Sequence, residues 1–165
     1  MAEPLRFSQF AAATAAGLAG TLYRSVEGDD GHALLDADGP VLAGALASYV
    51  CDVLGDTGPA SEDHGVMMVV AFNAPRDRIP ELEDWYAQEH IRLLRQADGW
   101  LRAINCRVRS ISGAPPWTHL AFHQLRDLSV MDSPERAVAR STEWRARLAK
   151  EPWFPAAGRW AYQRL

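Results

Sequence analysis

Continuous and alternating apolar positions in the second half of the chain predict four strands and two helices. The run GVMMVVAFN is apolar almost throughout, as expected of a strand buried on both faces. A helix is expected from Pro80 to Asp98, because Pro80 suits a first helical turn and Gly99 suits a helix end. The predicted strands are 65–73, 100–112, 117–125 and 158–165, and the predicted helices are 80–98 and 133–151. This β-α-β-β-α-β order is that of the ferredoxin-like α+β fold.

The first half of the chain predicts a related but weaker order, α-β-β-α. A Gly/Asp turn between two strand-like segments indicates a hairpin, and Pro40 suits the start of the helix that follows. Helices are predicted over 7–20 and 40–55, and strands over 21–28 and 31–39, with 4–7 as a candidate first strand. The segment GHALLDAD also aligns with THLAFHQL, which sets His32 over His119. An internal duplication and a chance match both explain this alignment.

The balance of charge changes between the two halves. Before Gly65 the basic residues are Arg6 and Arg24, against ten acids, whereas fifteen basic residues and eleven acids follow it. The change falls in GDTGPASEDHG, a Gly/Pro/Ser/Asp-rich stretch typical of a connector. We therefore expect a degenerate N-terminal ferredoxin-like half over 1–65 and a complete C-terminal half over 66–165.

The predicted helix ELEDWYAQEHIRLL carries two polar residues on its apolar side. At ~100° per residue, Glu89 falls in the same stripe as Leu82 and Tyr86. His90 lies at the margin of that stripe. A carboxylate on a buried helix face is costly unless it is paired or faces a polar cavity. Either these two residues belong to a functional site, or Glu89 pairs with an arginine of a neighbouring strand and His90 fills space.

Two of the predicted strands have one polar and one apolar face. Because side chains alternate along a strand, His119 and His123 share a face with Ala121. In the preceding strand, Asn105 and Arg107 share a face in the same way. The apolar faces suit packing against helices, so we expect the polar faces to line a separate polar cavity. The alternative is that the polar faces lie in water.

Composition narrows the classes of function. A net charge of -4 without a basic stripe argues against nucleic-acid binding, and no segment is apolar for long enough to predict a membrane span. A signal peptide is not expected, because no basic stretch precedes the small-residue run near the start. Cys51 and Cys106 lack metal-ligand spacing, so we expect two free thiols and a cytoplasmic protein.

Sequence motifs for metal, nucleotide and acyl-enzyme chemistry are missing. The chain has no HxH, HExxH, P-loop, GxGxxG or GxSxG pattern. His119 and His123 lie ~13 Å apart on an extended strand, too far to share one ion. We therefore expect neither a metal nor a cofactor. Acid–base chemistry remains, and histidine suits it because its ordinary pKa lies near neutral pH.

The stretch EDWYAQEHIRLLRQADGWLRA resembles the WY-x-x-EH signature of EthD-like proteins, which belong to the dimeric α/β-barrel superfamily. The matching residues are Trp85, Tyr86, Glu89, His90, Gly99 and Trp100. HLAFHQL followed by VMDSPERA also looks like the third strand and second helix of that family. The resemblance covers 66–165 well and the first half only through the faint repeat. The chain departs from the family at His119 and His123, where an aromatic residue is common, and at Asn105-Cys106, where an Arg-Tyr pair is common.

The resemblance implies two ferredoxin-like sheets that face each other and enclose a barrel. The sheets would come from the two chains of a homodimer or from two fused halves of one chain, and the polar strand faces would line the interior. Members of the superfamily include aromatic polyketide cyclases, cofactor-independent monooxygenases, small isomerases and haem-handling enzymes.

We expect a cofactor-independent lyase, isomerase or cyclase that uses histidine acid–base chemistry on a small carbonyl or polyketide-like substrate. The residues assigned to catalysis are His90, Glu89, His119 and His123, and those assigned to substrate binding are Tyr86, Trp85, Trp100, Asn105 and Arg107. One alternative is a cofactor-free or haem-dependent oxygenase of the same superfamily. Another is a binding or assembly protein without catalytic activity.

Overall fold

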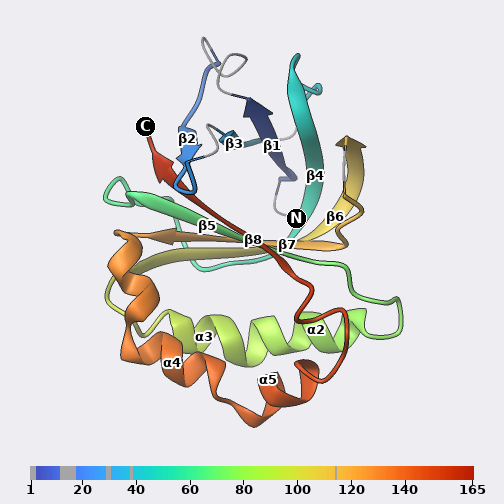
Figure 1. Ribbon diagram of the computed structural model, residues 1–165, viewed down its shortest axis with the longest axis vertical. Helices are drawn as coiled ribbons and strands as arrows, with labels where there is room; N and C mark the ends of the chain where they lie inside the picture. Colours follow the sequence, from blue (N-terminus) through green and yellow to red (C-terminus); the bar gives the residue numbers. More distant parts are fainter. Residues whose placement is uncertain (1–2, 12–17, 29–30, 38, 114) are drawn as a thin grey trace.

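Eight strands form a closed barrel, and helices cover one side of it (Figure 1). The computed structural model describes residues 3–11, 18–28, 31–37, 39–113 and 115–165. The strands are β1 (Leu5–Ala11), β2 (Leu22–Ser25), β3 (Gly31–Ala37), β4 (Ala45–Asp56), β5 (Val66–Phe72), β6 (Trp100–Gly113), β7 (His119–Leu125) and β8 (Gly158–Arg164). The helical segments are α2 (Ile79–Trp85), the π-helical turn η1 (Tyr86–His90), α3 (Ile91–Leu94), the 3-10 helix η2 (Leu128–Asp132), α4 (Pro134–Arg140) and α5 (Glu143–Leu148).

The order of strands around the barrel is the same in both halves of the chain. The order is β1-β3-β2-β8-β5-β7-β6-β4, so each half contributes its own fourth, first, third and second strands in turn. The halves join where β4 pairs with β6 and where β2 pairs with β8. One chain therefore closes the barrel, and the predicted ferredoxin-like α+β class with two fused halves is confirmed. The domain boundary between residues 65 and 66 stays a prediction, as does the homodimer.

The helix predicted over 40–55 is wrong, because this segment contains most of strand β4. Ala47, Tyr49 and Cys51 pack in the barrel core, and the residues between them are buried on the other face of the strand. The strand pairs with β1 on one side and β6 on the other, and these two ladders outweigh a weak local helix preference. Alternation within β4 was the available signal for a strand.

The helix predicted over 7–20 is also wrong where it can be compared. Its first residues, Phe7 to Ala11, belong to β1, while residues 12–17 lie outside the described part of the chain. The predicted hairpin is confirmed, since β2 and β3 pair in antiparallel register through Leu22 and Leu34.

The second half has the predicted elements with two changes. Its four strands lie where they are expected, and α2, η1 and α3 form one continuous rod from Ile79 to Leu94, shorter than predicted. The helix predicted over 133–151 is two short helices. The Ser133 hydroxyl caps α4, and the Thr142 hydroxyl accepts from the Arg145 N–H and caps α5. A new cap inside the segment explains the break before α5.

Apolar and aromatic side chains from all eight strands fill the interior of the barrel. Phe7 packs against Phe122 with ring centroids 5.3 Å apart, and Tyr49 and Tyr162 complete an aromatic centre. The free cysteines Cys51 and Cys106 are buried in the same cluster. The interior is therefore an apolar core.

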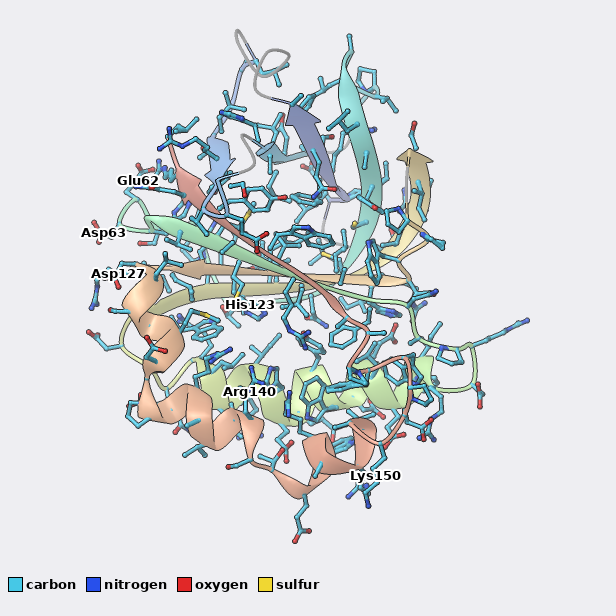
Figure 2. All side chains as sticks on the ribbon, viewed as in Figure 1. Glu62, Asp63, His123, Asp127, Arg140 and Lys150 are labelled. Carbon is cyan, nitrogen blue, oxygen red and sulfur yellow. The ribbon has the colours of Figure 1, made fainter. Side chains whose placement is uncertain are left out.

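The polar strand faces do not line this interior, and that prediction is wrong. His123 pairs in register with Met68 and Ala103, which pack against the helices, whereas its neighbour Phe122 points into the barrel. Figure 2 shows His123 between the sheet and the helix layer. Both faces of β7 are covered, one by the barrel core and one by helices. The histidine face of β7 thus turns toward α2, η1 and α3.

In the described part of the chain, no helix has the length and apolarity needed to cross a membrane.

Candidate functional site

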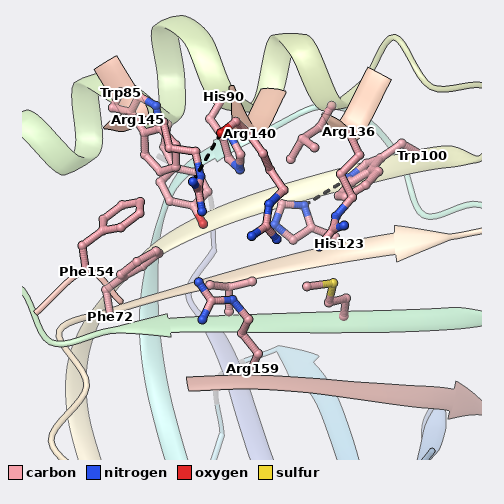
Figure 3. Close-up of a pocket in the computed structure, with 14 residues that line it drawn as sticks. Phe72, Trp85, His90, Trp100, His123, Arg136, Arg140, Arg145, Phe154 and Arg159 are labelled. Atoms are coloured by element: carbon pink, nitrogen blue, oxygen red, sulfur yellow. Dashed lines mark hydrogen bonds between the residues drawn. The ribbon is translucent and has the colours of Figure 1, made fainter. Parts of the chain in front are cut away.

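A pocket lies between the outer face of the second-half sheet and the helices, and we call it the helix–sheet pocket (Figure 3). Its apolar walls are mainly aromatic, formed by Phe72, Trp85, Tyr86, Trp100 and Phe154, with Met68, Val70 and Leu94 beside them. Its polar groups are the imidazoles of His90 and His123 and the guanidinium groups of Arg136, Arg140, Arg145 and Arg159. The structure thus brings together His90, His123, Tyr86, Trp85 and Trp100 from the predicted site, on the helix side of the sheet.

A π-helical turn sets the positions of the histidine and aromatic residues on the helix. The Ile91 N–H donates to the Tyr86 carbonyl, five residues back, which widens the helix over Tyr86–His90. In a regular α-helix, Trp85 and His90 would point ~140° apart. Here their rings stack with centroids 4.2 Å apart and an interplanar angle of 23°. The wide turn therefore brings Trp85, Tyr86 and His90 to the same wall of the pocket.

His90 is held as a neutral imidazole between two aromatic rings. It stacks on Trp85 and meets the edge of Tyr86 at a centroid distance of 5.4 Å. Burial lowers the pKa of His90 to about 3, the nearby His123 lowers it further, and a backbone hydrogen bond involving Ala139 opposes the shift. The residue keeps some solvent contact, but its Nδ1 atom is buried and has no hydrogen-bond partner in the described residues. A buried nitrogen without a partner, on a residue that lines a pocket, is unusual enough to suggest a functional role.

His123 is fully buried and its tautomer is set by a tryptophan. The Trp100 indole N–H donates to His123 Nδ1 at 3.1 Å, so a neutral His123 carries its proton on Nε2. Burial lowers the pKa of His123 to about 4. At neutral pH the ring is therefore a neutral hydrogen-bond donor at the floor of the pocket.

Tyr86 is a third titratable group at this site. Burial raises its pKa far above the ordinary value, while Arg159 and Arg145 oppose the shift. Its hydroxyl therefore stays protonated at neutral pH and can only act as a neutral donor or acceptor.

Glu89 lies outside the lining of the helix–sheet pocket and ties two helices together. Its Oε2 accepts a hydrogen bond from the Trp85 indole at 3.1 Å and another from the Thr142 hydroxyl at 2.8 Å. The partners of this carboxylate are thus neutral donors. The alternative expectation, that Glu89 pairs with an arginine of a neighbouring strand, is not observed among the described residues. Glu89 positions Trp85, on which His90 stacks, and it reaches His90 only through that ring.

His119, Asn105 and Arg107 form a separate group near the other end of the sheet. Glu83 accepts two hydrogen bonds from Arg107, at 2.8 and 2.7 Å, and lies 2.9 Å from His119 Nε2. Burial would raise the pKa of Glu83, but hydrogen bonds from His119 and Arg107 outweigh it and lower the pKa. Burial lowers the pKa of His119, with Glu83 opposing. The cavity beside His119 and Asn105 measures about 10 Å³, less than one water needs, so this group has no room for substrate as it stands.

The four arginines at the mouth of the helix–sheet pocket are the part of the site that sequence reasoning missed. Arg136 and Arg140 are one helical turn apart in α4, Arg145 lies in α5 and Arg159 in β8. The i, i+4 spacing in α4 was visible in the sequence. Their convergence with Arg145 and Arg159 depends on how α5 and β8 pack, and no local pattern encodes it.

The open space in the pocket is small in this arrangement of side chains. The cavity volume is about 50 Å³, enough for a few waters at roughly 10–15 Å³ each. The described residues contain no group of three or more His, Cys, Asp or Glu that could hold a metal ion. Haem, which one of the expected alternatives requires, does not fit this arrangement of side chains, because the cavity is far smaller than a porphyrin and His90 presents its face to Trp85. The side chains of Arg140 and Arg159, which line this cavity, are exposed.

No family model matches the sequence, and no curated protein is significantly similar to it. The similarity to EthD-like proteins therefore stays a prediction.

Several solved structures share the fold over nearly the whole chain. An anthrone oxidase-like protein has a TM-score of 0.67 at 12% identity, over 99% of this chain and 91% of its own. A major regulator of staphylococcal pathogenesis has a TM-score of 0.67 at 13% identity, over 99% of both chains. A heme-degrading enzyme from Listeria monocytogenes has a TM-score of 0.63 at 11% identity, over 98% of this chain and 99% of its own. At such low identity these likenesses show the fold alone, which is the ferredoxin-like α+β fold.

Proposed function

We propose that the chain is a cofactor-free oxygenase that removes a proton from an enolisable aromatic substrate in the helix–sheet pocket. The observation that carries the proposal is a pair of neutral histidines, His123 buried and His90 half-buried, that line one pocket with aromatic walls. A neutral imidazole can accept a proton, and aromatic walls suit a planar substrate. The anthrone oxidase-like and heme-degrading proteins of the same fold support an oxygenase.

The two histidines have different roles in this proposal. His123 donates from Nε2–H to a substrate oxygen, because Trp100 occupies its Nδ1. His90 accepts the proton, because its ring has no such donor on Nδ1. A pKa of about 3 makes His90 a weak base in the empty pocket. The negative charge that develops on the substrate would raise that pKa and strengthen the base at the moment of transfer.

The oxygen step needs no cofactor when the substrate carbanion is delocalised over aromatic rings. For an anthrone, His90 takes one C10 proton, and the carbanion reduces O2 and bonds to it as a peroxide at C10. Loss of the second C10 proton with cleavage of the O–O bond leaves a C10 carbonyl and releases water. The balance is one anthrone and one O2 giving one anthraquinone and one water.

A cyclase, isomerase or lyase is the second candidate, because the same proton transfer starts those reactions without oxygen. Both candidate functions use the same residues of the site. They differ in whether the substrate carbanion then reacts with O2. A barrel interior filled by apolar side chains is what we would expect of a binding or assembly protein without catalytic activity. The helix–sheet pocket lies outside that interior, so the filled barrel does not argue against catalysis in the pocket.

The proposal is tested with 1,8-dihydroxyanthrone under air and under nitrogen. Oxygen uptake is measured with an electrode, and exchange of the C10 protons in D2O is followed by NMR. We expect enzyme-dependent uptake of one O2 per substrate, and a loss of about 10²–10⁴-fold in kcat for His90→Gln. The matched control is Arg147→Gln, an exposed position in α5 away from the pocket.

Each other outcome points elsewhere. Proton exchange under nitrogen without oxygen uptake under air would favour the cyclase or isomerase. A folded His90→Gln variant with full turnover would refute the role of His90. A Soret band after adding haemin, with oxygen uptake only in its presence, would favour a haem-dependent oxygenase.

A further inference from the structure

The arginines at the mouth of the helix–sheet pocket form a cluster that nothing in the proposed chemistry requires. The arginine cluster is Arg136, Arg140, Arg145 and Arg159. Figure 3 shows the side chains of Arg136, Arg140 and Arg145 descending from the helices and that of Arg159 rising from β8, toward the same pocket. Four positive charges therefore face one small pocket.

None of these four guanidinium groups is ion-paired with a carboxylate in the part of the chain that the structure describes. Three of them donate instead to backbone carbonyls: Arg136 to Met131 at 2.8 Å, Arg145 to Arg140 at 3.3 Å, and Arg159 to Ala157 at 3.2 Å. Elsewhere in the molecule arginines commonly have acidic partners. Ion-paired arginines are Arg78, Arg102, Arg107, Arg109, Arg126 and Arg164. The four arginines that line this pocket thus have no carboxylate partner among the described residues.

Like charges in a partly buried place raise the free energy of the empty pocket. Burial lowers the pKa of Arg136, and Arg140 and Arg159 lower it further, with Asp132 opposing. Burial also lowers the pKa of Arg145, and the other three members of the cluster add to the shift. A bound anion would reverse this repulsion and supply acceptors for the unpaired N–H groups. The cluster is therefore suited to an anionic ligand.

The surrounding walls indicate what else the anion carries. The Arg145 guanidinium lies 5.6 Å from the centroid of the Phe154 ring, which in turn packs against Phe72 and Trp85. Guanidinium groups beside aromatic faces match a planar ligand with an anionic edge, because the ring stacks while the edge accepts bidentate hydrogen bonds. An inorganic anion would interact with the guanidinium groups but would make no stacking contact with the aromatic walls.

We propose that the ligand of the helix–sheet pocket is an aromatic carboxylate, with its ring against the aromatic walls and its carboxylate among the four arginines. This inference rests on the proposed function and narrows its substrate class. The carboxylate also places the substrate ring next to His90 and His123. It would draw Arg140 and Arg159 inward over the ring, which excludes water from the site of proton transfer.

The test compares 1-hydroxy-2-naphthoate with its neutral amide, 1-hydroxy-2-naphthamide. Binding is measured by calorimetry at 50 and 200 mM salt, and by the change in tryptophan fluorescence, to which Trp85 and Trp100 in the pocket wall contribute. We expect the carboxylate to bind about 10- to 100-fold tighter than the amide, and to weaken with salt while the amide does not. Equal binding of the two compounds would overturn the inference.

Arginine variants separate the cluster from general surface charge. Arg140→Gln and Arg159→Gln remove exposed members of the cluster, and each should weaken carboxylate binding by about tenfold without changing amide binding. Arg147→Gln makes the same change of charge away from the pocket and should leave both affinities unchanged. If Arg147→Gln weakens carboxylate binding as much as the cluster variants do, the cluster is not the binding site.

The binding assay and the oxygen-uptake assay together distinguish this inference from the proposed function. If the carboxylate binds tightly but no substrate shows oxygen uptake or proton exchange, the anion site is supported and the oxygenase activity is refuted. If oxygen uptake is equally fast with neutral and carboxylated substrates, the oxygenase activity is supported and the preference for a carboxylate is refuted.

Discussion

Lowering the pH from 7.5 to 5 should destabilise the folded chain, because two pocket histidines resist protonation only while the chain is folded. The ordinary histidine pKa of 6.5 falls to about 4 for His123 and about 3 for His90. Below pH 6.5 the unfolded chain binds protons at these positions and the folded chain does not, so stability falls as the pH drops. The loss continues until the pH reaches the folded pKa values.

The size of this effect follows from the two pKa shifts. One pKa unit corresponds to ~1.36 kcal/mol, and pH 5 lies ~1.5 units below the unfolded value. His123 should therefore cost about 2 kcal/mol at pH 5. His90 should cost up to about the same, less because it keeps some solvent contact. His119 adds to the loss, since burial lowers its pKa too. A total of about 3–4 kcal/mol is a large share of the roughly 5–15 kcal/mol that stabilises a typical domain.

Urea unfolding at pH 7.5, 6.5, 5.5 and 5.0 measures the free energy of unfolding directly. His123→Gln is the informative variant. Below pH 6 its free energy of unfolding should fall with pH by about 1.36 kcal/mol per pH unit less than that of the parent, whatever its stability at pH 7.5. Arg147→Gln should keep the full slope. A free energy that changes by less than about 1 kcal/mol over this range, or a His123→Gln slope equal to that of the parent, would refute the reasoning.

Three further substitutions test the surroundings of the pocket. Trp100→Phe removes the donor to His123 and should raise the His123 pKa by up to about one unit, measured by NMR titration of the ring, since such a bond contributes ~0.5–1.5 kcal/mol. Thr142→Val removes both the α5 cap and a hydrogen bond to Glu89 and should cost about 1–2 kcal/mol in urea unfolding, whereas Thr142→Ser should cost far less. Phe7→Ala should cost about 3–5 kcal/mol but leave ligand affinity unchanged, and altered affinity would contradict a barrel core separate from the pocket.

The fold of the second half could be predicted because its signals are strong and local. The continuous apolar run at Val66–Phe72, the Ser133 cap and the alternation in β7 each favour one structure. The strand β4 was misassigned because its inward residues, Tyr49 among them, alternate with others that suit a helix as well. Only the pairing with β1 and β6 decides the question.

The sequence named several of the residues that line the helix–sheet pocket, but it did not show how they are arranged. Alternation shows that His119 and His123 share a face, but it does not say which of two covered faces that is. The apolar face of β7 packs in the barrel core, so its histidine face packs against the helices. The π-helical turn that stacks Trp85 on His90 leaves no mark in the sequence, because it depends on how the helix packs against the sheet.

A barrel closed by two unlike halves also fixes the stoichiometry of ligand binding. A barrel built from two identical sheets would carry two equivalent pockets related by a twofold axis, and those pockets could communicate through the strands they share. Here the helix–sheet pocket is built from β5 to β8 and the helices between them. We therefore expect this pocket to bind one ligand per chain, with a hyperbolic isotherm and a Hill coefficient of one.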